Sequence, residues 1–110
     1  MTHDEVVAVA RSLPGVVEAT SYGTPSIKVG SKFLLRLREP GILVLQRPSL
    51  DERDALLEAG PALFFITDHY RGHPYLLVRL DDLAPDHFRA LFETIWREKA
   101  SRAQTSAYGG

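Results

Sequence analysis

The chain has 110 residues, of which 45% are hydrophobic and 25% charged, and these proportions are those of a single ordinary globular domain. Because it contains no cysteine, disulfide bridges and thiolate metal or redox sites are excluded. The formal net charge of −1 argues against an indiscriminate nucleic-acid binder, and no apolar run approaches the roughly 18 residues of a membrane span.

The first predicted element is a helix over residues 2–13. Thr2 and Glu5 have the spacing of a capping box, in which each side chain satisfies a backbone N–H of the first turn. A Pro-Gly pair ends the helix, and residues 16–22 follow as a strand with alternating side chains.

Residues 24–38 are predicted to form a β-hairpin around Gly30-Ser31, because a glycine-first pair suits a two-residue type II′ turn. Successive side chains of a strand point to opposite faces of a sheet. One predicted face is apolar and comprises Ile27, Val29, Phe33, Leu35 and Leu37. The other is basic and comprises Lys28, Lys32, Arg36 and Arg38. The apolar face therefore needs a cover, and the basic face is left for solvent or a ligand.

The middle of the chain supplies more strands and a second helix. Residues 42–46 are predicted as an apolar strand, and residues 49–60 as a helix between a serine cap and a terminal glycine. Residues 63–67 are expected to form either a strand or a buried turn of irregular chain, and a further strand is expected over 75–80. The last of these alternates so that Leu76, Val78 and Leu80 point inward and Tyr75, Leu77 and Arg79 outward.

The last helix begins at Pro85 and has the strongest helical periodicity of the chain. Its apolar residues are Phe88, Leu91, Phe92, Ile95 and Trp96. These elements predict an α+β domain of two layers, with an antiparallel sheet of about five strands and the N- and C-terminal helices on one face. We assign residues 1–100 to this single domain and predict a disordered tail over 101–110, where the residues are small and polar.

The basic face of the hairpin is the first candidate site. Residues 20–48 include five basic residues and one acidic residue, whereas residues 51–110 include seven basic and ten acidic residues. Side chains on one face of a strand lie about 6–7 Å apart, which resembles the spacing of phosphates along a nucleic-acid strand. Tyr75 and Arg79 extend this face if their strand joins the same sheet. The alternative is a solvated outer face whose lysines discourage edge pairing.

The loop of residues 69–75 is a second candidate, with aromatic and basic side chains suited to a surface wing that stacks on or pairs with a ligand. The alternative is a simple turn in which Tyr70 packs down on the domain. His69 and His73 have the four-residue spacing of a helical metal pair, but Gly72 and Pro74 oppose a helix there. We therefore expect no metal site in this loop.

A third set, Ser26 with Glu18 and a histidine, can be drawn as a hydrolase triad. The sequence has no G-x-S-x-G elbow to expose the serine, and it has no glycine-rich phosphate motif. We therefore expect neither an enzyme nor a cofactor.

Short motifs of the chain follow one another in an order that carries a family resemblance. They are Leu13-Pro14-Gly15-Val16, Gly23-Thr24-Pro25, Lys28-Val29, Gly30-Ser31-Lys32-Phe33, Tyr70 with Gly72, and Arg97 after Trp96. This ordered set, within residues 6 to about 102, resembles the MmcQ/YjbR family of small bacterial proteins. The resemblance implies a fold similar to the frataxin/CyaY type and a role in DNA binding through wing-like hairpins.

Carried onto this chain, the resemblance makes the hairpin and the loop the two wings. We expect a DNA-binding protein whose contact residues are Lys28, Lys32, Arg36, Arg38, Tyr70, Arg71, His73 and Arg79. The alternative is a domain that binds a small molecule or a protein, with the outer sheet face and the turn of residues 22–25 recognising an anionic group. In both cases we expect a cytoplasmic protein that favours the monomer and does not bind membranes.

Overall fold

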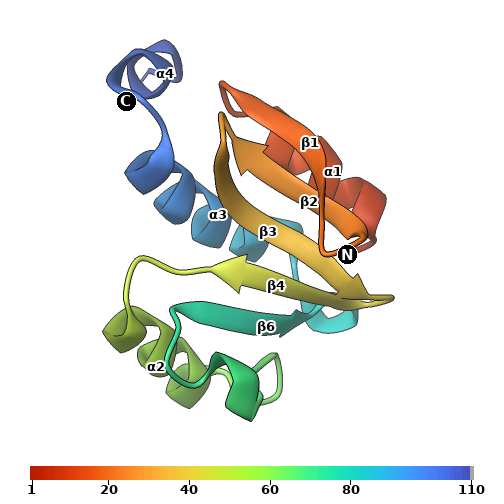
Figure 1. Cartoon of the computed structure of the whole chain (residues 1–110). Coiled ribbons are helices and arrows are strands. Elements are labelled where there is room, and N and C mark those ends of the chain that lie inside the picture. The colour runs from red at the N-terminus through yellow and green to blue at the C-terminus, as the bar shows by residue number, and fades with distance from the viewer. Residues whose placement is uncertain (110) are drawn as a thin grey trace.

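The computed structural model describes residues 1–109 and is built around one antiparallel sheet of six strands (Figure 1). The strands are β1 (Val16–Ser21), β2 (Thr24–Val29), β3 (Lys32–Glu39), β4 (Ile42–Gln46), β5 (Phe64–Phe65) and β6 (Tyr75–Arg79). Their order across the sheet is β1-β2-β3-β4-β6-β5, so the first four form a meander. The α+β class is confirmed, and the two-residue strand β5 makes the count six.

Two helices, α1 (His3–Arg11) and α3 (Pro85–Lys99), lie behind the sheet in Figure 1. Both capping-box hydrogen bonds of α1 are present, at 3.1 Å to the Thr2 hydroxyl and 2.8 Å to the Glu5 carboxylate. These hydrogen bonds from Thr2 hold the pKa of Glu5 below its ordinary value, because they favour the charged carboxylate.

The main core lies between the sheet and these two helices. Phe88, Phe92, Ile95 and Trp96 of α3 have no exposed surface, and their burial confirms the last helix as the principal cover of the sheet. The indole N–H of Trp96 donates to the carbonyl of Pro14 at 2.9 Å, which ties α3 to the end of α1.

Helix α2 (Leu50–Ala59) lies at the edge of the sheet formed by β6 and β5 (Figure 1). Arg47 anchors the start of α2, because its buried guanidinium pairs with Glu52 and donates to the carbonyl of Leu91 in α3 at 2.9 Å. Two 3-10 turns, η1 (Asp68–Tyr70) and η2 (Leu80–Asp82), flank β6.

A β-bulge changes which side chains share a face of the central hairpin. The Gly30-Ser31 turn forms as predicted, with Gly30 at a φ of +59°, but pairing shifts register between Ile27 and Lys28. Ile27 lies opposite Leu35, Lys28 opposite Phe33, and Val29 opposite Lys32.

The shift moves Phe33 and Lys32 to the faces opposite those predicted. Phe33 lies on the outer face with Lys28, and the core is filled by both Leu34 and Leu35, which are fully buried. Lys32 faces the helices and donates to the carbonyl of Lys99 at 3.2 Å. The predicted four-cation face is therefore wrong at Lys32, because a bulge adds one residue and reverses the alternation beyond it.

The outer face of the sheet is partly covered by the chain itself. Tyr70, at the end of η1, packs on Val44 of β4 and Leu77 of β6 in a second, small apolar cluster. The segment that contains η1 therefore folds back over the sheet, on the face that α1 and α3 leave uncovered.

The last described segment forms a helix, α4 (Arg102–Ala107), which differs from the predicted disordered tail. Ser101 and Gln104 form a capping box, and the ring of Tyr108 packs edge-to-face on Trp96 at 5.2 Å between ring centroids. The apolar contact stabilises a segment whose own composition is polar. Gly110, the end of the predicted tail, lies outside the described residues. No helix among residues 1–109 is both long enough and apolar enough to cross a membrane.

Candidate functional site

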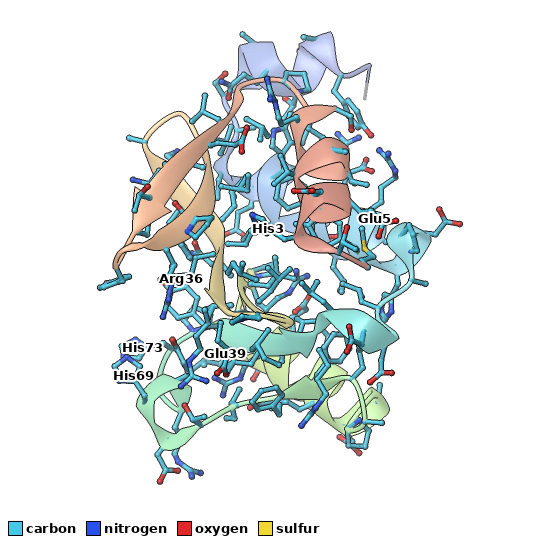
Figure 2. All side chains as sticks on the ribbon, turned by 90° about the vertical axis from the view of Figure 1, so that its right-hand side faces the viewer. His3, Glu5, Arg36, Glu39, His69 and His73 are labelled. Carbon is cyan, nitrogen blue, oxygen red and sulfur yellow. The ribbon has the colours of Figure 1, made fainter. Side chains whose placement is uncertain are left out.

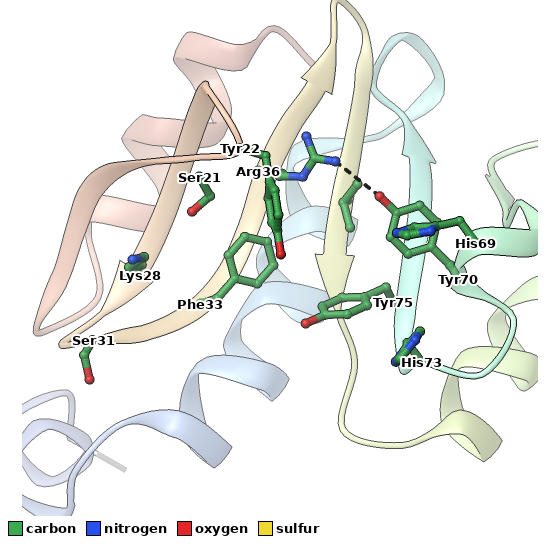
Figure 3. A pocket seen from close by; sticks show the side chains of 11 residues that line it. Ser21, Tyr22, Lys28, Ser31, Phe33, Arg36, His69, Tyr70, His73 and Tyr75 are labelled. Carbon is green, nitrogen blue, oxygen red and sulfur yellow. Dashed lines mark hydrogen bonds between the residues drawn. The ribbon is translucent and has the colours of Figure 1, made fainter.

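A groove of about 760 Å³ opens on the outer face of the sheet, between the β1–β2 turn and η1 (Figure 3). The side chains that line it are aromatic, basic or small and polar. They belong to Ser21, Tyr22, Lys28, Ser31, Phe33, Arg36, Val44, His69, Tyr70, His73 and Tyr75. None of these residues is acidic, so the groove has a positive character in a chain whose net charge is −1.

Arg36 of β3 lies at the centre of this groove and connects its two walls. Its guanidinium donates to the Thr24 hydroxyl at 3.2 Å and to the Tyr70 hydroxyl at 3.2 Å, and Figure 3 marks the second of these hydrogen bonds with a dashed line. The guanidinium carbon also lies 5.3 Å from the centre of the Tyr22 ring, within the range of a cation–π contact. Within the described residues, neither Arg36 nor Lys28 forms an ion pair. Both cations are therefore available to an anion.

A row of aromatic rings forms the floor. Phe33 and Tyr75 meet edge-to-face with ring centroids 5.9 Å apart, and Tyr75 meets Tyr70 in the same way at 6.0 Å. Burial, with smaller contributions from Tyr22 and Tyr70, raises the pKa of Tyr75 above its ordinary value. The Tyr75 hydroxyl is thus a neutral hydrogen-bond donor at physiological pH.

Tyr22 projects over the groove from the β1–β2 turn and is 90% exposed. It has a φ of +53° and is followed by Gly23 at +74°, the pattern of a type I′ turn. Among residues 1–109, Tyr22 is the only non-glycine with a positive φ. Asparagine, aspartate or glycine normally occupies this position, because a bulky side chain is strained there. An exposed aromatic ring in a strained turn indicates that the ring serves something other than stability.

Arg53 of α2 fixes the other wall of the groove from behind. This guanidinium is 3% exposed and donates to the backbone carbonyls of Tyr70, Arg71 and His73 at 2.8, 3.1 and 2.6 Å. The loop after η1 is therefore held by one buried side chain. Sequence patterns do not indicate this role, because Arg53 occupies an ordinary position in a polar helix.

Four of the eight predicted contact residues line the groove: Lys28, Arg36, Tyr70 and His73. Figure 2 shows Arg36, His69 and His73 on one side of the molecule and helix α1, with His3, on the other.

The other four predicted residues lie elsewhere. Lys32 faces the helices, and Arg38 occupies a second bulge of β3, 3.5 Å from the carboxylate of Glu39. Arg71 is paired with Asp68, and Arg79 lies over the ring of Phe65 at 4.2 Å. The predicted basic stripe is reduced to two cations surrounded by aromatic rings.

The other candidate sites lack the geometry that they need. Ser26 is 2% exposed and accepts a hydrogen bond from Ser21, while Glu18 pairs with Arg11 beside α1 on the opposite face of the sheet. Ser26 and Glu18 therefore point to opposite faces of the sheet and do not belong to one hydrolase triad. Within residues 1–109, no group of three or more histidine, aspartate or glutamate side chains is placed to hold a metal ion.

Phe33 is the groove residue that the sequence placed on the wrong face. The signal for its position is the apolar run Phe33-Leu34-Leu35. Successive side chains of a regular strand alternate between faces, so two neighbours of this run can both enter the core only at a bulge.

Comparison with known proteins bears on the fold and the family of the chain. A search of curated proteins found no match. The crystal structure of Deinococcus radiodurans protein DR2400, which has the domain DUF419, superposes with a TM-score of 0.72 over 98% of this chain and 88% of that one, at 20% identity. The family model described as YjbR matches residues 11–98. Since this match spans most of the chain, the protein belongs to the YjbR family.

Proposed function

We propose that the protein is a nucleic-acid-binding module without catalytic activity, in which Lys28 and Arg36 contact backbone phosphates across the groove. One observation carries the proposal. Among residues 1–109, Lys28 and Arg36 form no ion pair, and they lie in a groove whose lining contains no acidic side chain. The resemblance to the MmcQ/YjbR family supports DNA as the nucleic acid.

The two cations have a spacing that suits a phosphate backbone. Lys28 of β2 lies opposite Phe33 and Arg36 of β3 opposite Ser26, so the two cations are diagonal neighbours on paired strands. Diagonal neighbours lie about 7–8 Å apart, which is close to the distance between successive phosphates of an extended chain.

A second candidate is a small anionic ligand with an aromatic ring. The groove volume of about 760 Å³ is in the range of small-molecule sites, and Arg36 is already held in place by Thr24 and Tyr70. Such a ligand would stabilise the fold, by about 2.7 kcal/mol when it is present at 100 times its Kd.

The test compares DNA binding by the wild type with that of Lys28→Gln/Arg36→Gln, using fluorescence anisotropy at several salt concentrations. We expect the double variant to bind more weakly and to lose about 0.7–0.9 of log–log salt slope per phosphate contact removed. The matched control is Lys32→Gln/Arg71→Gln, which removes the same charge outside the groove.

The proposal requires the control to keep the affinity and slope of the wild type, with thermal unfolding used to verify that all three proteins are folded. Equal losses in both double variants indicate a non-specific effect of charge and contradict the proposed site. A thermal shift with a nucleoside monophosphate, together with no DNA binding, favours the small-ligand candidate.

A further inference from the structure

We infer that the groove binds unpaired nucleotides of a single strand, with bases stacked on its exposed aromatic rings, and does not bind the backbone of a duplex. This inference rests on the proposed function and specifies the form of nucleic acid that the site accepts.

The number of cations is the first argument. Proteins that hold duplex DNA by its backbone typically neutralise about 6–10 phosphates. Among the residues that the structure describes, Lys28 and Arg36 are the two arginine or lysine side chains that line this groove, because the two bulges of β3 remove Lys32 and Arg38 from it. Two contacts provide little affinity for a duplex at physiological salt, so another interaction must contribute.

The aromatic rings supply that interaction. A base stacked on an aromatic side chain contributes about 5- to 160-fold in affinity. The first bulge places Phe33 on the outer face, where it meets Tyr75 with ring planes 79° apart. Bases inside a duplex are already stacked on one another and cannot reach such rings, whereas unpaired bases can.

Tyr22 extends the stacking surface above the floor. One side of its ring is occupied by the guanidinium of Arg36, yet the side chain remains 90% exposed. Figure 3 shows the ring of Tyr22 projecting over the groove beside Phe33, with Tyr75 close by. The free surface of Tyr22 and the floor residue Phe33 therefore offer stacking positions next to a phosphate-binding arginine.

The experiment measures anisotropy with a labelled oligothymidylate of about 16 nucleotides, a mixed-sequence duplex of similar length, and unlabelled thymidine monophosphate as competitor. We expect the single strand to bind at least about 10-fold more tightly than the duplex. Its log–log salt slope should be about 1.4, since each of two phosphates contributes about 0.7 for single strands.

The stacking role is tested by Phe33→Leu, which keeps an apolar side chain and removes the ring, and by Phe33→Tyr, which restores a ring. We expect Phe33→Leu to weaken single-strand binding about 5-fold or more and Phe33→Tyr to retain it. Thermal unfolding of both variants shows whether the fold is kept. Phe65→Leu, on the same sheet face but beneath Arg79, is the control outside the groove.

The outcomes separate this inference from the proposed function. Equal affinity for duplex and single strand, or full binding by folded Phe33→Leu, overturns the inference but leaves phosphate binding by Lys28 and Arg36 in place. Competition by the monophosphate at the concentration at which the oligonucleotide itself binds also overturns it, because the ligand is then a free nucleotide. Absence of binding to either DNA contradicts the proposed function as well.

Discussion

At the scale of single residues, Tyr22 combines a cost to the fold with a gain for the site. A non-glycine residue in the left-handed region costs about 1–2 kcal/mol, and asparagine tolerates that region better than other side chains. The cation–π contact with Arg36 stabilises the folded state by about 0.5–1 kcal/mol, which offsets part of this cost. Tyr22 is therefore neutral to mildly destabilising for the fold, although its ring remains 90% exposed.

Tyr22→Asn is predicted to unfold in urea with a free energy equal to that of the wild type or up to about 1 kcal/mol higher, because relief of strain offsets the lost contact. The same variant should bind oligothymidylate more weakly. Tyr22→Ala, which removes the ring without relieving the backbone, is the matched variant. If the unfolding free energy of Tyr22→Asn is more than about 1 kcal/mol below that of the wild type, the strain argument is contradicted.

Arg53 differs from Tyr22, because it stabilises the fold and affects the groove only by positioning the loop after η1. Arg53→Met leaves three backbone carbonyls without their donor and is predicted to lower the unfolding free energy by about 2–4 kcal/mol. Amide hydrogen exchange of residues 70–73 should increase more than that of β3. The comparison is Arg71→Ala, an exposed residue expected to change stability by less than about 0.5 kcal/mol.

At the scale of elements, the alternation of inward and outward side chains predicted the faces of most strands correctly but not those of β3. β6 follows the expected pattern, with Leu76 and Val78 in the core and Tyr75 on the outer face. β3 does not, because two bulges interrupt its pairing. Periodicity identifies the strand and its apolar content, but the position of a bulge depends on packing against the neighbouring strands and the helices. For this reason alternation places Lys28 and Arg36 on the outer face, as in the structure, but places Phe33 on the wrong face.

The bulge reverses the expected costs of two neighbouring substitutions. Leu34→Ala removes a fully buried side chain and is predicted to lower the unfolding free energy by about 2–5 kcal/mol. Phe33→Ala should cost less than about 1.5 kcal/mol, because the Phe33 ring is only half-buried on the outer face. Urea unfolding of both variants is the measurement. If β3 had no bulge at this point, Phe33→Ala would lower the unfolding free energy more than Leu34→Ala.

At the scale of the whole molecule, the sheet separates stability from binding. One face packs on α1 and α3 and contains the principal core, while the other carries the groove (Figures 1 and 3). Counting charges along the chain identified the central hairpin as basic, yet only two of its four cations reach the groove. Charge along a sequence does not specify the face on which each side chain emerges. Helix α4 was missed for a similar reason, since its order comes from a contact with Trp96 and not from its composition.

Because the core and the groove lie on opposite faces of the sheet, we expect a change in α4 to affect stability and not binding. Tyr108 packs on Trp96, the single tryptophan of the chain, and an aromatic pair is worth about 0.5–1.5 kcal/mol beyond its buried area. Tyr108→Ala should therefore lower the melting temperature and shift tryptophan fluorescence to the red, as water reaches the indole. Binding of oligothymidylate should not change, because Tyr108 packs on the core side of the sheet, and the groove opens on the other side.

Together with Tyr22→Asn, Tyr108→Ala forms a pair in which each variant affects one property. Tyr22→Asn should reduce binding without loss of stability, and Tyr108→Ala should reduce stability without loss of binding below its melting temperature. If Tyr108→Ala also weakens binding at a temperature where it is fully folded, the two faces are coupled through the sheet, and the groove then depends on how α3 and α4 pack behind it. If Tyr22→Asn keeps full binding, the Tyr22 ring takes no part in stacking, and binding in the groove then depends on its other residues.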